Sequence, residues 1–183
     1  MYLTNHFLIA MPSLQDPYFR QSVTYICEHN ENGAFGIIIN HPINLRLEHV
    51  FEQMEIKSEN ETLKQMPVLL GGPIHQERGF IIHRPSGIWR SSINTAPDIC
   101  VTTSQDILQA IAENKGPEEF LVALGYAGWG EKQLEQEILS NSWLCCPANT
   151  NIIFETPMTE RWANAAKLLG IDINQLSGDA GHA

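Results

Sequence analysis

The run from Leu124 to Gly130 is the part of the chain whose residue types and spacing most favour ligand chemistry. Three glycines, Gly125, Gly128 and Gly130, stand between an apolar segment and a segment with helical spacing. A turn from a strand into a helix aims backbone N–H groups and the positive helix end at whatever lies above it, which favours phosphate or carboxylate. The run lacks the Gly-Lys-Ser/Thr of a P-loop and the spacing of the dinucleotide fingerprint.

This glycine run supports two interpretations. In the first, Gly125, Gly128, Trp129 and Gly130 bind a small anionic or nucleotide-like ligand. In the second, the glycines only prevent clashes in a tight turn, and Trp129 packs on the core. Lys132 falls in the first turn of the expected helix. A cation there opposes the helix dipole, so we expect it to be solvated or to help attract an anion.

Polar residues at the ends of two expected strands form a second set of candidates. Glu28 and His29 end one strand, and Asn40 and His41 end the next. A Glu and a His held together can perform general acid–base chemistry. The alternative is that Glu28, His29 and Asn40 are ordinary hydrogen-bonded residues. Gly72, in Gly71-Gly72-Pro73, belongs to a turn whose backbone amides could also face a ligand.

The remaining reactive side chains point to no catalytic residue, metal or cofactor. Cys27 lies in an apolar strand beside Glu28, which opposes thiolate formation, so we expect a buried and inert thiol. His75 and His83 have no carboxylate or thiol at a spacing typical of metal ligands. The four cysteines have no Cys-x-x-Cys spacing, and the chain has no Gly-x-Ser-x-Gly elbow.

Hydrophobic spacing predicts the elements that must position these residues. Strands are expected at 7–10, 23–28, 34–40, 68–70, 79–83, 99–102, 120–124 and 152–154. A helix capped by Asn44 is expected to carry Leu47, Val50, Phe51 and Met54, and further helices are expected after Ser104, at 131–140 and after Thr156-Pro157. Residues 57–65 are expected to form a loop, and residues from Ser177 onward to be mobile.

Early hairpins followed by strand–helix alternation predict an α+β fold, with a mixed, mostly antiparallel sheet covered by helices. No linker or repeat interrupts the sequence, so residues 1–183 are expected to form a single domain. Apolar runs such as Ile37-Ile38-Ile39 are too short to span a bilayer, and the first residues have no basic segment typical of a secretory signal. We therefore expect a cytoplasmic protein without a membrane partner.

The charge of the chain argues against nucleic-acid binding. The formal net charge is −10, and acidic residues exceed basic ones in every third of the chain. Proteins that bind DNA need a basic face that displaces counterions from the phosphates, and no Lys/Arg cluster is present. Direct DNA contact is therefore not expected.

Motifs along nearly the whole chain closely resemble the AlgH/YqgE family of bacterial proteins. In the first half they are Asn5-His6-Phe7-Leu8-Ile9-Ala10-Met11-Pro12, Asp16-Pro17-x-Phe19, Val23-x-Tyr25-Ile26-Cys27-Glu28-His29-Asn30, Gly33-Ala34-x-Gly36 and Gly71-Gly72-Pro73. Then come Arg78-Gly79-Phe80-Ile81-Ile82-His83, Leu124-Gly125-Tyr126-Ala127-Gly128-Trp129, Gln133-Leu134-Glu135, Glu137-Ile138, Asn141-x-Trp143 and Gly181-His182-Ala183. Two departures are Lys132, where the family usually has Gly, and His41, where it often has Arg.

The resemblance implies a single α+β domain in the bacterial cytoplasm. The family is generally uncharacterised, and its name is associated with transcriptional regulation of an exopolysaccharide pathway. Our first hypothesis is a regulatory or binding protein that acts through a ligand or protein partner. The second is an enzyme or binder of a small anionic or nucleotide-like ligand at Gly125–Gly130, and the third is a direct transcriptional regulator. The oligomeric state is left open.

Overall fold

Strand β9 (Glu119–Trp129) is the centre of the fold in the computed structural model, which describes residues 1–178. The sheet has ten strands, in the order β10-β1-β2-β3-β9-β6-β8-β7, with β5 beside β9 and β4 beside β5. The pairs are antiparallel except that β5 runs parallel to β9. The other strands are β1 (His6–Ala10), β2 (Val23–Asn30), β3 (Gly33–Ile38), β4 (Pro42–Arg46), β5 (Pro67–Leu70), β6 (Ile74–Arg84), β7 (Ser92–Asn94), β8 (Cys100–Thr102) and β10 (Trp143–Pro147).

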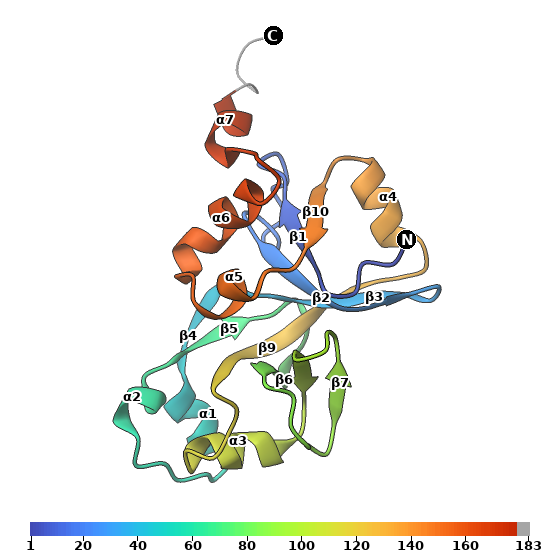
Figure 1. Cartoon of the computed structure of the whole chain (residues 1–183). Helices are drawn as coiled ribbons and strands as arrows, with labels where there is room; N and C mark the ends of the chain where they lie inside the picture. The colour runs from blue at the N-terminus through green and yellow to red at the C-terminus, as the bar shows by residue number, and fades with distance from the viewer. Residues whose placement is uncertain (179–183) are drawn as a thin grey trace.

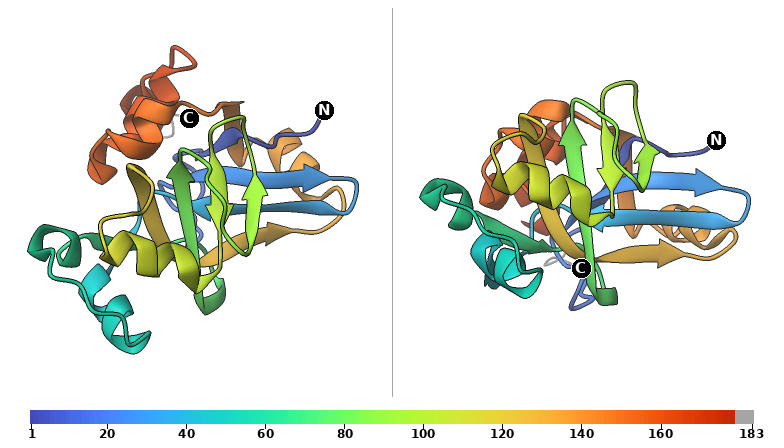
Figure 2. Two further views of the ribbon diagram at one scale, coloured as in Figure 1. Left: turned by 60° about the horizontal axis from the view of Figure 1, so that its bottom comes forward. Right: turned by 90° about the horizontal axis from the view of Figure 1, so that it is seen from below.

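The sheet is strongly curled, and β9 belongs to both of its halves. The first part of β9 pairs with β6, whereas its last residues pair with β3. Figure 2 shows the green strands of one half running across the blue strands of the other. Gly125 lies at a register shift within the β6 pairing, two residues before the first partner of β3, and has a φ of 78°, a conformation that favours glycine. Pairing with β3 begins just beyond this residue, at Ala127.

Three groups of helices cover different parts of the sheet (Figure 1). The helices α5, α6 and α7 pack on the largest core cluster, around Phe7, Tyr25 and Ile82. The second cluster lies under α1, α2 and α3, and the third lies under α4. The bounds are α1 (Leu47–Gln53), α2 (Glu61–Lys64), α3 (Gln105–Ala112), α4 (Gln133–Leu139), α5 (Thr150–Phe154), a 3₁₀ helix (Met158–Glu160), α6 (Arg161–Lys167) and α7 (Ile173–Gly178).

The predicted fold class, a single α+β domain with a mostly antiparallel sheet, is confirmed. Its most important error concerns the glycine run, since residues 125–129 continue β9 and do not form a turn. Within the run, Ala127 and Trp129 are buried, whereas Tyr126 and Gly128 are more exposed. This alternation is the period of a strand, which the glycine content obscured.

Several other local predictions were wrong because tertiary pairing overrode local preference. The segment 152–154 is helical, and Asn149 caps it by accepting the Ile152 N–H at 3.1 Å. The unpredicted β10 pairs with β1. Asn44 lies in β4, so α1 begins only after Arg46.

Smaller differences between the predicted and the observed structure concern segments that were predicted to be loops or helix starts. The expected loop at 57–65 contains the short helix α2. The helical segment after Pro157 begins as a 3₁₀ turn at Met158, because Pro157 keeps an extended ψ of 141°. Residues 177 and 178 belong to α7, and the rest of the tail predicted to be mobile lies outside the described residues.

Candidate functional site

The backbone amides of the glycine run are already used within the fold. Phe35 pairs with Gly128, and Gly36 pairs with Ala127, so this part of β9 belongs to the hydrogen-bonded ladder. The Gly130 N–H donates to the Gln133 side-chain oxygen at 2.9 Å. Lys132 then caps α4 with a φ of 60° and is exposed. The ligand-binding role of Gly125, Gly128 and Gly130 stays a prediction, but the turn on which it depended is absent.

Gly71, Gly72 and Gly125 instead let two backbone segments cross. A Cβ atom on Gly72 would lie 2.1 Å from the Tyr126 carbonyl carbon, and one on Gly71 would lie 2.3 Å from the Gly125 oxygen. Neither backbone can move away without breaking strand pairing. This close approach explains why glycine is required at Gly71 and Gly72. Both glycines are buried.

Trp129 packs on the core, as the second interpretation of the glycine run predicted. Its indole N–H donates to Oε2 of Glu137 at 2.8 Å, and the Trp143 indole donates to the same oxygen at 2.9 Å. The Phe19 ring contacts both indoles, with centroid distances of 6.0 and 5.5 Å. A carboxylate thus satisfies two buried indole donors and holds α4 against the sheet.

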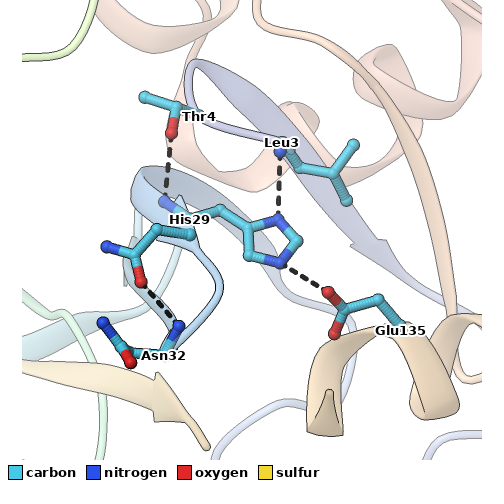
Figure 3. A network of polar contacts seen from close by, with 6 residues as sticks. Leu3, Thr4, His29, Asn32 and Glu135 are labelled. Carbon is cyan, nitrogen blue, oxygen red and sulfur yellow. Dashed lines mark hydrogen bonds and ion pairs between the residues drawn. The ribbon is translucent and has the colours of Figure 1, made fainter. Parts of the chain in front are cut away.

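His29 uses both ring nitrogens in internal hydrogen bonds (Figure 3). The Leu3 N–H donates to Nδ1 at 3.0 Å, which requires the proton to be on Nε2. The Nε2–H then donates to Oε1 of Glu135 at 2.9 Å, and the His29 side chain is 1% exposed. The pKa of Glu135 is below its usual value, first through its own backbone N–H and then through His29, against the effect of burial. His29 therefore joins the N-terminal segment to α4.

The structure does not bring the other polar candidates together. Glu28 points to the solvent side of β2 and accepts a hydrogen bond from the Asn30 side chain at 3.0 Å. Asn40 links two segments, because it accepts the Val23 N–H at 2.9 Å and donates to the Gln21 carbonyl at 2.8 Å. Glu28 and His29 therefore do not form an acid–base pair, since neighbouring residues on a strand face opposite sides.

Cys27 and His83 are also held inside the core. Burial, and then Glu28, raises the pKa of the Cys27 thiol, as the sequence predicted for an inert cysteine. His83 donates from Nδ1 to the Pro85 carbonyl at 3.0 Å, and its Nε2 lies 2.7 Å from the Thr102 hydroxyl. Burial lowers the pKa of His83. Within residues 1–178, no group of three or more His, Cys, Asp or Glu side chains is arranged to hold a metal ion.

A groove on the sheet that sequence reasoning missed is the candidate ligand site. It has a volume of about 560 Å³, and every lining residue comes from a strand or an adjoining loop. The volume lies in the range of pockets that bind small molecules. We call this hollow the aromatic groove, and it is lined by Phe35, Arg78, Phe80, Ser91, Ser92, Ile93, Val101, Thr103 and Tyr126.

Three rings from three strands form one wall of the aromatic groove. Tyr126 of β9 lies between Phe35 of β3 and Phe80 of β6, with centroid distances of 6.0 and 5.5 Å. The Arg78 guanidinium lies over the Phe80 ring at 5.6 Å and is exposed. Aromatic rings can pack against a planar group of a ligand, and a cation beside them can pair with an anion attached to that group.

Among the residues that the structure describes, those lining the groove carry no carboxylate, imidazole or thiol. The lining therefore offers rings, hydroxyls and one guanidinium, which suit binding more than acid–base or nucleophilic chemistry. The sequence contained one relevant signal, since Tyr126 belongs to the glycine run. Its partners Phe35 and Phe80 are far away in the chain and become neighbours only through strand pairing.

The curled sheet and its groove define a small α+β domain with a ligand-sized hollow, and comparison with known proteins gives the family. The model of the AlgH-like family matches residues 7–174, so the chain belongs to the AlgH-like family. A UPF0301 protein of Nitrosococcus oceani is 52% identical over 182 residues, covering 100% of this chain and 97% of the relative. A UPF0301 protein of Thioalkalivibrio sulfidiphilus is 55% identical over 180 residues, covering 98% and 96%.

Solved structures agree with the fold. The solution structure of the AlgH protein from Pseudomonas aeruginosa has a TM-score of 0.81 at 45% identity and covers 100% of this chain and 97% of that one. A crystal structure of a Corynebacterium diphtheriae protein has a TM-score of 0.74 at 20% identity, covering 96% and 91%, and it supports the fold alone. Among the described residues, no helix has the length and apolar character needed to cross a membrane.

Proposed function

We propose that this chain is a regulatory ligand-binding protein whose aromatic groove holds a small planar molecule with an anionic group. It acts through this ligand, in the cytoplasm, and not by direct contact with DNA. The observation that carries the proposal is the wall of three rings with Arg78 at its edge. A base or another flat ring packs on such a wall, and a phosphate or carboxylate pairs with the guanidinium.

The composition of the groove favours binding over catalysis. Ser91, Ser92 and Thr103 offer hydroxyl groups that can orient a ligand, but nothing in the lining activates them as nucleophiles. The four cysteines are all free, which suits a reducing compartment. These features support the hypothesis of a binding protein over that of an enzyme.

The proposal is tested by measuring affinity for two related probes, adenosine 5′-monophosphate and adenosine. Both carry the planar base, and only the first carries the anion. We expect Arg78→Gln to weaken binding of the nucleotide by about tenfold, the effect of one hydrogen bond to a charged group. Binding of adenosine should not change. Tyr126→Leu should weaken both probes, because it removes a ring while keeping an apolar side chain.

Lys132→Gln is the matched control, since it removes one positive charge from an exposed position outside the groove. It should leave both affinities within about twofold of the wild type, because exposed charges are screened by salt. Equal weakening by Arg78→Gln and Lys132→Gln would show that only net charge matters. That result, or the absence of binding by either probe, would refute the proposed site.

A further inference from the structure

A second hollow, away from the aromatic groove, is lined by one arginine and, within residues 1–178, by no acidic residue. It has a volume of about 390 Å³ and lies between the loop before β2, the end of β3 and the start of α6. We call it the Arg20 pocket. Its lining residues are Pro17, Arg20, Gln21, Asn40, His41, Met158, Thr159 and Trp162. The absence of a carboxylate from this lining contrasts with the net charge of −10 for the chain.

Arg161, the residue before Trp162 in the chain, adds a buried positive charge next to this lining. It is 5% exposed, and its Nε donates to the Thr156 carbonyl at 2.9 Å. Its Nη1 donates to the carbonyl of Ile39, the residue before Asn40. Burial lowers the pKa of Arg161 to about 10, so the guanidinium keeps its charge at neutral pH. A buried charge that bonds only to carbonyls favours an anion nearby.

The loop that carries Arg20 is held firmly over the pocket. Asp16 accepts the N–H groups of Tyr18 and Phe19 at 2.9 and 3.1 Å, and the Arg20 N–H donates to the Asp16 carbonyl. The Asp16 carboxylate is thus engaged in the turn and does not line the pocket. These bonds fix the position from which Arg20 extends.

Asn40 joins this loop to the rest of the pocket. Its side chain holds Gln21, whose φ of 54° is uncommon for a residue other than glycine. Strained backbone of this kind persists only where surrounding contacts enforce it, and it is concentrated at functional sites. His41 also lines the pocket, and burial lowers its pKa. Asn40, which the sequence predicted to bind a ligand, therefore lines the Arg20 pocket.

We propose that the Arg20 pocket binds a small oxyanion, a phosphate or a carboxylate, between Arg20 and the polar groups of Gln21 and Thr159. Trp162 forms a wall of the site, and its indole N–H donates to the Ala10 carbonyl at 2.9 Å. The guanidinium of Arg20 supplies direct pairing, and the buried charge of Arg161, which is bonded to the carbonyl of Ile39 beside Asn40, adds a positive field. This site is separate from the aromatic groove, with which it shares no lining residue.

The test is a titration of isotope-labelled protein, followed by NMR, with inorganic phosphate in one arm and acetate in the other. Sodium chloride at matched ionic strength is the reference. We expect one or both oxyanions to shift the Trp162 indole N–H and the Asn40 side-chain amide, and the arm that does so identifies the anion. Arg20→Gln should weaken this binding by about tenfold. Arg78→Gln, in the aromatic groove, should have no effect on it.

Lys167→Gln is the matched control, because Lys167 is an exposed cation on α6 that does not line the pocket. It should leave the affinity within about twofold of the wild type. Shifts equal to those caused by sodium chloride would overturn the proposal, and so would equal weakening by Arg20→Gln and Lys167→Gln. Neither result would affect the aromatic groove, since adenosine is uncharged and reports on that site alone.

Discussion

His29, His83 and Cys27 are the residues whose chemistry is most controlled by burial. Each has the side-chain type of a catalytic group, but each is enclosed and bonded within the fold. A histidine with both nitrogens occupied cannot exchange a proton with a ligand without losing an internal bond. Residue type and spacing in the sequence therefore mark these residues as candidate catalytic groups. Their burial and their hydrogen-bond partners in the structure show that they stabilise the fold.

The thiols should differ in reactivity according to burial. Cys145 is only partly buried, whereas Cys27, Cys100 and Cys146 are buried. We expect an aromatic disulfide reagent at neutral pH to label Cys145 first and Cys27 slowly. Cys145→Ser should remove the early phase, and all four thiols should react in denaturant. Rapid labelling of Cys27 in the native protein would contradict the buried position.

The partly buried His41 and the buried His83 should make stability depend on pH. Burial lowers the pKa of both His41 and His83 in the folded protein. The unfolded chain therefore binds more protons below about pH 6.5, and stability should fall as the pH falls below that value. Unfolding free energies at pH 7 and pH 5 check this. His83→Gln should reduce the difference between the two values, and a difference as large as that of the wild type would contradict this expectation.

At the scale of elements, the crossing of the segment after β5 over β9 organises the sheet. Gly71 and Gly72 pass against Gly125 and Tyr126, and this crossing lies where β9 changes partners. The same crossing presents Tyr126 beside Phe35 and Phe80. The glycines thus act on the candidate site indirectly, by setting the path of the strands that carry its rings.

Two glycines give a matched test of this crossing. Gly72→Ala should destabilise the protein by at least about 3 kcal/mol, because its Cβ would meet backbone atoms of Tyr126 that cannot move. Gly79→Ala, in β6, places its Cβ in open space and should stay within about 1 kcal/mol of the wild type. Denaturant unfolding measures both. Similar stability for the two variants would show that the crossing tolerates a side chain.

The elements differ in how far local sequence could predict them. Spacing located β1, β2, α3 and much of β9, because their apolar residues follow regular periods. Spacing did not show that β9 continues past Gly125, because a glycine-rich sequence before a helix is also typical of a turn. It also missed β10, whose pairing with β1 is a long-range contact. The aromatic groove was missed for the same reason, because Phe35, Phe80 and Tyr126 meet only through the sheet.

At the scale of the whole molecule, charge limits the partners of this AlgH-like protein. The net charge of −10 repels nucleic-acid backbones at long range. The two hollows that carry cations without carboxylates are small, so they suit small anions and offer no extended basic face.

We expect the protein not to bind duplex DNA with sequence preference. Fluorescence anisotropy of labelled promoter and scrambled duplexes at physiological salt checks this. The isolated protein should show the same weak binding to both, because its net charge is −10 and its sequence has no Lys/Arg cluster to displace counterions. Sub-micromolar binding that depends on the sequence would overturn the expectation and favour a direct transcriptional regulator.

The central claim is that the aromatic groove binds a planar anionic ligand. Mapping of amide chemical shifts during titration with adenosine 5′-monophosphate at millimolar concentrations tests it most directly. We expect the largest changes at residues that line the groove, namely Phe35, Arg78, Phe80, Ser92 and Tyr126. Changes centred on Gly130 and Gln133 would show that the ligand binds at the start of α4 and not in the groove. An unchanged spectrum would contradict ligand binding in the groove.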